Sequence, residues 1–288
     1  MTPAIIANAA DLLSRYDAIF CDVWGVMHNG RRAYEESGDA LARFRDGGGT
    51  VILVSNAPVP AAGVERVLER TGVRRDAWDA IVSSGDIALA HIAERGYRNL
   101  HRIGPARRDS MLFSRLPGSS VPVAEADAIV CTGLADDANE TVATYHPLID
   151  EGVARKVPFL CANPDLVVDV GEKRYLCAGS IAAEYERRGG AVFWAGKPHR
   201  SAYEAAFEQA AALRGSRPQP ARVLAIGDAV RTDLAAAHGA GIDALFIGSG
   251  IHNQDVLIDG VIDPAKLASL FAPSGTPPAV AAMTQLRW

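Results

Sequence analysis

Three short, widely separated strings of the chain carry side chains that can do chemistry. They are Asp22-Val23-Trp24-Gly25-Val26, Gly196-Lys197-Pro198 and Gly227-Asp228-Ala229-Val230-Arg231-Thr232-Asp233. Each string follows an apolar run that is typical of a strand, and so does the pair Ser55-Asn56. Together they offer carboxylates for a hard metal ion, and a hydroxyl and an ammonium group for a phosphate.

The elements that must position these residues alternate between strands and helices. Apolar runs predict strands at residues 18–21, 50–54, 222–226 and 244–247, and helical patterns cover residues 36–46, 59–71, 201–213 and 232–238. Short apolar runs bounded by glycine are typical of strands that are buried on both faces. The alternation predicts an α/β fold with a Rossmann-like, doubly wound parallel sheet and right-handed crossovers. Because ligands bind such a sheet at the carboxyl ends of its strands, the residues that follow these strands are predicted to share one rim.

The middle of the chain alternates in the same way but holds none of the three strings. Its clearest strands are predicted at 129–133 and 158–161, and its clearest helix at 139–152. We therefore predict a discontinuous core domain, residues 1–81 plus 189–288, and a second α/β domain, residues 82–188, inserted into it. The proline-rich end, residues 272–288, is predicted to be an irregular tail on the surface.

The composition of the chain limits the classes of protein to which it can belong. The chain has 288 residues, 49% of them hydrophobic and 22% charged, as in ordinary globular proteins. A formal net charge of −5 gives no electrostatic case for nucleic acid or an anionic membrane as partner. No stretch approaches the roughly 18 apolar residues that span a bilayer, and residues 1–17 lack the pattern of a secretory signal. Four scattered cysteines fit no zinc pattern, so we expect buried free thiols in a cytoplasmic protein.

The residue types at the predicted rim suit phosphoryl transfer. Asp22 and Asp228, with a carbonyl and waters, would make a hard-oxygen site for Mg²⁺. The metal and Lys197 would neutralise phosphoryl oxygens while a serine hydroxyl donates a hydrogen bond. A carboxylate nucleophile such as Asp22 can take a phosphoryl group and later release it to water.

The ordered set of Asp22, Ser55, Lys197 and Asp228, with the Gly227–Asp233 string, resembles the haloacid dehalogenase (HAD) superfamily. The long insertion between Ser55 and Lys197 resembles its class IIA branch, which holds a C2-type cap domain there and includes NagD-like and pyridoxal phosphate phosphatases. Three further strings look like class IIA: Ser55-Asn56-Ala57-Pro58, Ala162-Asn163-Pro164-Asp165 and Ala195-Gly196-Lys197-Pro198. The resemblance covers nearly the whole chain.

The resemblance implies a Mg²⁺-dependent hydrolase of a small phosphate monoester, such as a sugar, nucleotide or pyridoxal-type phosphate, through an aspartyl phosphate. The catalytic residues would be Asp22 as nucleophile, Lys197 and Ser55. The implied metal ligands are Asp22, the backbone carbonyl of Trp24, Asp228 and Asp233. The implied phosphate- and substrate-binding residues are Ser55, Asn56, Lys197, Trp24, Gly25, Asn163 and Asp165. A homodimer is a further implication, because similar proteins commonly dimerise through the cap.

Trp24 departs from this pattern. In the family's phosphatases the residue two beyond the nucleophile is an aspartate, which protonates the leaving oxygen and then activates water. An indole cannot replace it, because its N–H is a donor that does not titrate. His28 could substitute from the loop after the strand, or it is an ordinary surface histidine. The indole could instead stack on a ring of the substrate.

Three function classes follow. The first is a magnesium-dependent phosphatase with a cap over its site. The second is a non-hydrolytic or weakly active phosphometabolite-binding protein, which Trp24 favours. The third is a receiver-type phospho-acceptor, against which the chain length and the Gly227–Asp233 string argue. The sequence determines neither the substrate nor the oligomeric state.

Overall fold

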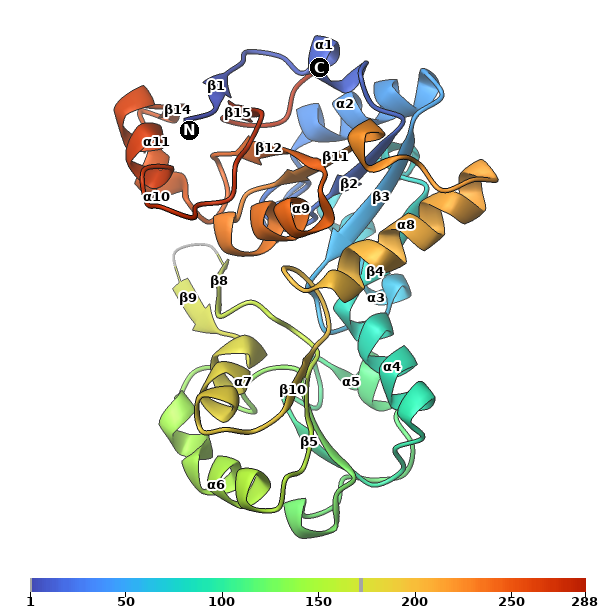
Figure 1. The fold of residues 1–288 in the computed structure, drawn as a ribbon, viewed down its shortest axis with the longest axis vertical. Helices are drawn as coiled ribbons and strands as arrows, with labels where there is room; N and C mark the ends of the chain where they lie inside the picture. Colours follow the sequence, from blue (N-terminus) through green and yellow to red (C-terminus); the bar gives the residue numbers. More distant parts are fainter. Residues whose placement is uncertain (1, 171–172) are drawn as a thin grey trace. The chain divides into compact units, whose positions relative to one another are not determined.

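The computed structural model describes residues 2–170 and 173–288, and its chain divides into two compact units (Figure 1). The first unit comprises Met1–Ser55, Glu65–Val82 and Lys197–Trp288. The second comprises Asn56–Val64 and Ser83–Gly196. The chain therefore leaves the first unit after Ser55, returns to it over Glu65–Val82, and returns for the last time at Lys197.

A parallel sheet of seven strands forms the centre of the first unit, in the order β1-β15-β12-β11-β2-β3-β4. The strands are β1 (Ala4–Ile5), β2 (Ala18–Cys21), β3 (Thr50–Ser55), β4 (Ala80–Ser83), β11 (Val223–Gly227), β12 (Asp243–Ile247) and β15 (Ala281–Met283). The strands predicted from apolar runs match β2, β3, β11 and β12 to within one residue at each end. Every residue of β2 and β3 is buried, as expected for central strands covered on both faces. The predicted α/β class with a Rossmann-like parallel sheet is confirmed.

Helices and short turns connect these strands. They are α1 (Ala10–Leu13), α2 (Glu35–Asp46), α3 (Ala61–Thr71), η1 (Arg75–Ala77), α8 (Arg200–Arg214), η4 (Pro220–Arg222), η5 (Val230–Leu234), α9 (Ala235–Ala240), α10 (Asn253–Val256) and α11 (Pro264–Leu270), with a hairpin of β13 (Leu257–Ile258) and β14 (Val261–Ile262). Helix α8 covers the middle of the sheet, because the rings of Tyr203 and Phe207 pack edge-on against Phe20 of β2 at 5.5 and 5.0 Å between centroids. This packing fixes the segment that precedes α8, which carries Lys197.

The second unit has its own parallel sheet of four strands, in the order β10-β7-β6-β5, and an antiparallel pair of strands, β8 and β9. The elements are α4 (Ser84–Arg95), β5 (Leu100–Ile103), α5 (Ser110–Phe113), η2 (Val123–Glu125), β6 (Ala128–Cys131), η3 (Val142–Tyr145), α6 (His146–Ala154), β7 (Phe159–Cys161), β8 (Val167–Val170), β9 (Lys173–Leu176), α7 (Ala178–Arg187) and β10 (Val192–Trp194). Ile129, Phe159, Ile181 and Tyr185 lie in its main hydrophobic cluster.

Two boundaries in this unit differ from the sequence analysis. Strand β10 pairs with β7, although residues 189–288 were assigned to the core, so the second unit extends to Gly196. The helix predicted over 139–152 begins at His146, after a separate 3₁₀ turn that Thr141 caps. Pro147 explains the later start, because a proline without an N–H is accommodated in the first turn of a helix.

The end of the chain corrects a further prediction. We expected an irregular surface tail over residues 272–288, but β15 is buried and pairs in parallel with both β1 and β12. Ala282 is fully buried, and so is Leu286 beyond the strand. The prolines before residue 280 gave the segment its irregular character, and a strand of three small apolar residues is too short to show a period.

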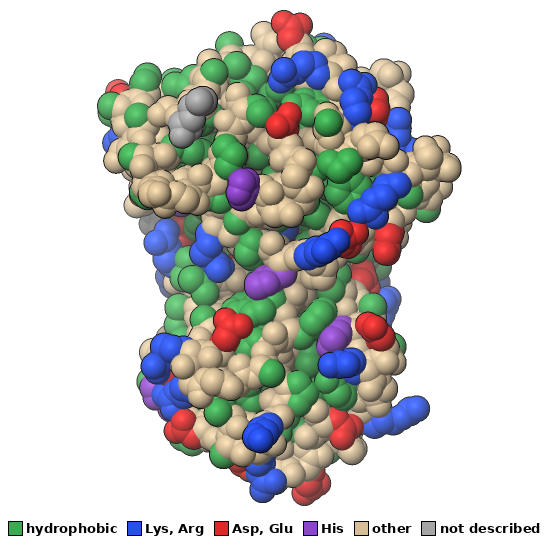
Figure 2. Space-filling model, in the orientation of Figure 1, with side chains coloured by type: hydrophobic (Ala, Val, Ile, Leu, Met, Phe, Trp, Pro, Cys, Tyr) green, Lys and Arg blue, Asp and Glu red, His purple; other side chains and the backbone are tan. Residues whose placement is uncertain are grey.

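The described residues bear on three further expectations. All four cysteines are buried and carry free thiols. None of the helices in the described ranges has the length and apolar character that crossing a membrane requires. On the face drawn in Figure 2, acidic and basic side chains are interspersed, without a large patch of either sign.

A charge on β15 should destabilise the first unit. We expect Ala282→Asp to lower the free energy of unfolding by about 3 kcal/mol or more, because it buries an unpaired carboxylate in the sheet. Val280→Asp is the matched control: Val280 is 40% exposed just before the strand, so its cost should stay within about 0.5 kcal/mol. Urea denaturation of both variants measures the difference, and equal small effects would mean that the end of the chain is not a core strand.

Candidate active site

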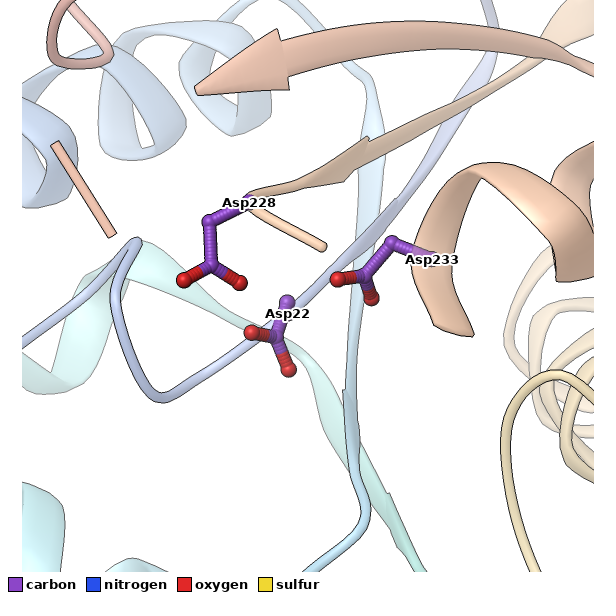
Figure 3. Close-up of side chains that lie close together, drawn as sticks. All are labelled: Asp22, Asp228 and Asp233. Carbon is purple, nitrogen blue, oxygen red and sulfur yellow. The ribbon is translucent and has the colours of Figure 1, made fainter. Parts of the chain in front are cut away.

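Three neighbouring strands bring the predicted residues to one rim of the large sheet. β2 lies between β11 and β3, with Cys21 in register with Ile226 on one side and Leu53 on the other. Asp22 follows β2, Asp228 follows β11 and Ser55 ends β3. Because the strands are parallel, these residues meet at the same edge. Figure 3 shows the carboxylates of Asp22, Asp228 and Asp233 directed toward one another.

Lys197 links three segments of this rim through hydrogen bonds. Its Nζ donates to Oδ1 of Asp22 at 2.6 Å, to Oδ1 of Asp233 at 2.7 Å and to the carbonyl oxygen of Val54 at 2.7 Å. The side chain is 2% exposed, so the ammonium has left water and depends on these acceptors. The predicted pairing of Lys197 with Asp22 is present, and the bond from Lys197 to the β3 carbonyl of Val54 was not predicted.

Asp233 is positioned by a local departure from the predicted helix. In place of a regular start at 232, a π-helical turn, Val230–Leu234, precedes α9. The turn places Asp233 so that the backbone N–H of Ala229 donates to its Oδ2 at 3.1 Å. A Cβ on Gly227 would lie 2.2 Å from Cβ and Cγ of Asp233, so glycine is required at the end of β11. π-turns inside helices are frequent at functional sites.

Asp228 is held by backbone groups from two loops. The N–H of Ile251 donates to its Oδ2 at 2.6 Å. A Cβ on Gly250 would lie 1.8 Å from that oxygen, and a Cβ on Gly25 would lie 2.2 Å from it. Gly25 was predicted to bind substrate, and here it contacts Asp228. Gly250 and Ile251 were missed, although their place just after the strand at 244–247 puts them at the same predicted rim.

Burial and neighbouring charges shift the pKa values of three groups in the site. Burial raises the pKa of Asp22 to about 7, although the Lys197 ammonium opposes this. Burial, and then repulsion by Asp22 and Asp233, raises the pKa of Asp228 well above its usual range. Burial lowers the pKa of Lys197, but the two carboxylates that it contacts outweigh burial and raise the pKa overall.

This arrangement fits a hard divalent cation. Each of the three aspartates offers one oxygen, and these oxygens lie within 4.8 Å of one another. Three carboxylates and one ammonium leave a formal charge of −2 when all are ionised. Oxygen ligands with this excess negative charge are what Mg²⁺ and Ca²⁺ prefer in proteins.

Trp24 is held by its own loop. The indole lies against Gly30, where a Cβ would come within 2.5 Å of Cη2, and His28 meets the indole edge-on at 5.1 Å between centroids. His28 is 1% exposed, so the alternative of a surface histidine is wrong. Its Nδ1 accepts from the N–H of Gly30 at 2.9 Å, and burial lowers its pKa to about 4. The imidazole is therefore neutral near pH 7.

The remaining predicted residues belong to the second unit. Asn56 Nδ2 donates to Oδ1 of Asp165 at 3.0 Å, and Oδ1 of Asn163 accepts from the backbone N–H of Asp165 at 3.2 Å. These bonds hold the three residues together within that unit. Their contact with a substrate stays a prediction.

The close approach of Gly250 to Asp228 gives a direct test. Gly250→Ala should force the carboxylate to move, and we expect the affinity for Mg²⁺ to fall at least about tenfold, or about 1.4 kcal/mol. Gly239→Ala is the control, because a Cβ there meets nothing within 4 Å and alanine favours the helix. Isothermal calorimetry checks both variants, and unchanged affinity in Gly250→Ala would show that Asp228 needs no such fixed position.

Comparisons with known proteins agree with this geometry. A family model for haloacid dehalogenase-like hydrolases matches residues 19–112, and a HAD-hydrolase-like model matches residues 194–272. A search of curated proteins found no significant match. A hydrolase of the haloacid dehalogenase-like family from Brucella suis has a solved structure that is 40% identical, with a TM-score of 0.84 over 98% of this chain and 100% of its own.

Two more distant structures share the fold. A possible sugar phosphatase of the HAD superfamily from Cytophaga hutchinsonii is 20% identical, with a TM-score of 0.72 over 98% of both chains. NagD from E. coli is 19% identical, with a TM-score of 0.63 over 94% of this chain and 96% of its own. The predicted resemblance to the superfamily and its class IIA branch is confirmed. The identity over nearly the full length of the Brucella protein, together with both family models, shows that the chain belongs to the haloacid dehalogenase-like family of hydrolases.

Proposed function

We propose that the protein is a metal-dependent phosphatase that hydrolyses a small phosphate monoester through an aspartyl phosphate on Asp22. The observation that carries the proposal is the buried Lys197 ammonium, which bridges Asp22 and Asp233 beside Asp228. Such a cluster joins a nucleophile to the positive charge that phosphoryl oxygens need. The distant neighbour described as a possible sugar phosphatase supports the same chemistry.

The proposed cofactor is Mg²⁺. Asp22, Asp228 and Asp233, with the backbone carbonyl of Trp24, would hold it, because they supply hard oxygen ligands and an excess of negative charge. When bound, a divalent cation neutralises phosphoryl oxygens and so favours their approach to a carboxylate.

The protein's own residues then divide the work. Lys197 fixes the Asp22 carboxylate through Oδ1 and, with Ser55, holds the phosphoryl oxygens. A carboxylate oxygen of Asp22 forms a bond to phosphorus while the bond from phosphorus to the leaving oxygen breaks. A water then attacks the phosphorus, which releases inorganic phosphate and restores the carboxylate.

The second unit is proposed to act as a cap that selects the substrate. Asn56, Asn163 and Asp165 are its proposed contacts, and the mutual hydrogen bonds of these residues would keep them in place. The substrate would be a small phosphorylated metabolite. We place the protein in the cytoplasm on the basis of its free thiols.

A second candidate is a phosphometabolite-binding protein with little or no turnover. Trp24 favours it, because the indole of this residue, two positions after the proposed nucleophile, cannot exchange protons with a leaving group or with water. The two candidates share the phosphate and metal site and differ in whether phosphate is released.

Replacing the nucleophile tests the first candidate. Asp22→Asn should reduce phosphate release at least about 10³-fold, because an amide does not attack phosphorus. Asp17→Asn is a matched control at the amino end of the same strand, where Asp17 pairs with Arg222 on the surface. Its phosphate release should stay within about twofold of wild type. Wild-type binding of phosphometabolites without release would favour the binding protein.

Metal removal tests the cofactor. Phosphate release should stop with EDTA and return with Mg²⁺, and Mg²⁺ at 100 times its Kd should stabilise the fold by about 2.7 kcal/mol. Asp228→Asn should lose most of this stabilisation, while Asp17→Asn should keep it. Thermal unfolding with and without Mg²⁺ reports binding independently of turnover. Activity that survives EDTA would exclude the metal-dependent mechanism.

A further inference from the structure

Hydrolysis through Asp22 requires two proton transfers. When the bond from phosphorus to the leaving oxygen breaks, its electron pair goes to that oxygen, which needs a proton unless its anion is stable. When water attacks the aspartyl phosphate, the water must lose a proton. A positioned acid or base accelerates such steps by about 10²–10⁴.

The loop that follows the nucleophile supplies neither group. Trp24 stands two residues beyond Asp22, and its indole N–H is a donor that does not titrate. Gly30 and His28 pack against the indole. His28 is itself buried, and the N–H of Gly30 occupies its Nδ1.

Two other titratable groups near the rim, Asp233 and His252, are engaged elsewhere. Asp233 accepts from Lys197 with one oxygen and from the N–H of Ala229 with the other. His252 contacts Asp255 through Nδ1 at 2.8 Å and the N–H of Val230 through Nε2 at 3.5 Å.

Residues 23–34, between the nucleophile and α2, hold no aspartate or glutamate. The loop that carries Trp24 therefore offers no carboxyl group for either proton transfer.

We infer that Trp24 restricts the substrate to acyl or aryl phosphates, whose leaving groups depart as stable anions, and that the aspartyl phosphate accumulates. This inference rests on the proposed function. In the first step Asp22 takes the phosphoryl group, and a carboxylate or phenolate leaves with the electron pair and later takes a proton from solvent. In the second step water attacks without a base, so loss of the phosphoryl group from Asp22 is slow.

A series of para-substituted phenyl phosphates tests the first step, because its members share one ring and differ mainly in the basicity of the leaving oxygen. With the full-length protein and Mg²⁺, we expect kcat/KM to fall more than tenfold from p-nitrophenyl to unsubstituted phenyl phosphate. Acetyl phosphate should react, and glycerol phosphate should react more slowly than any aryl ester. A fall of less than tenfold would overturn the inference.

Two readouts test the second step. Rapid mixing with p-nitrophenyl phosphate should give a burst of about one nitrophenolate per protein chain before slow turnover. Intact mass after incubation with acetyl phosphate should show one added phosphoryl group, which Asp22→Asn lacks. Turnover with neither a burst nor an added phosphoryl group would show that the aspartyl phosphate does not accumulate, and would overturn this part of the inference.

Variants at Trp24 separate proton transfer from side-chain size. Trp24→Asp should bring the rates for phenyl and p-nitrophenyl phosphate closer together and remove the burst, while Trp24→Asn, of similar size without a titrating group, should do neither. Equal effects of the two variants would overturn the assignment to proton transfer. If no phosphate is turned over, or if Asp22→Asn keeps full activity, the proposed function itself fails and the inference fails with it. The wild-type series gives its answer even where a variant does not fold.

Discussion

The buried ammonium of Lys197 is the contact on which the rest of the site depends. It joins the residue after β2, the carbonyl of Val54 within β3 and the π-turn that carries Asp233. A buried charge that loses its partners costs several kcal/mol, so these three segments must remain where the ammonium can reach them. α8 keeps Lys197 in place by packing on β2, which makes the hydrophobic core and the polar rim parts of one arrangement. The same ammonium pairs with two of the three clustered carboxylates, and the remaining negative charge is what suits the cluster to a divalent metal.

Close packing of backbone against carboxylate is the second constraint on the rim. Gly25 and Gly250 approach Asp228, and Gly227 approaches Asp233, at distances that leave no room for a Cβ. These glycines let the main chain, rather than flexible side chains, fix two of the three carboxylates. Backbone groups carry no rotamer freedom, so carboxylates held in this way lose little entropy when a cation binds. The use of glycine at these positions destabilises the folded state somewhat, because glycine loses more conformational freedom on folding than other residues do.

Much of the large sheet could be predicted because its central strands are apolar on both faces. The runs at β2, β3, β11 and β12 end within a residue of their predicted limits, and the rim follows from the rule for parallel sheets. The features that escaped prediction depend on distant parts of the chain. β15 is a strand only because β1 and β12 offer it a place, β10 belongs to the second unit because β7 pairs with it, and His28 is buried by the fold of its loop. The donor to Asp228 is a backbone N–H at Ile251; its place after the strand at 244–247 puts it at the rim, but no side chain marks it as a donor.

The charge cluster and Trp24 affect different contributions to the rate of phosphoryl transfer. Positioning and charge stabilisation supply most of the acceleration of phosphoryl transfer. In the proposed mechanism both would come from Asp22, Lys197, Asp228 and Asp233. A general acid contributes a further 10²–10⁴, which corresponds to about 3–5 kcal/mol. A leaving group that is stable as an anion needs little of this contribution, whereas an alkoxide needs all of it. With the proposed mechanism, Trp24 would let the site discriminate through the reaction barrier rather than through binding, so an alkyl phosphate would occupy the site and still not react. Selectivity of this kind requires no contact with the leaving group.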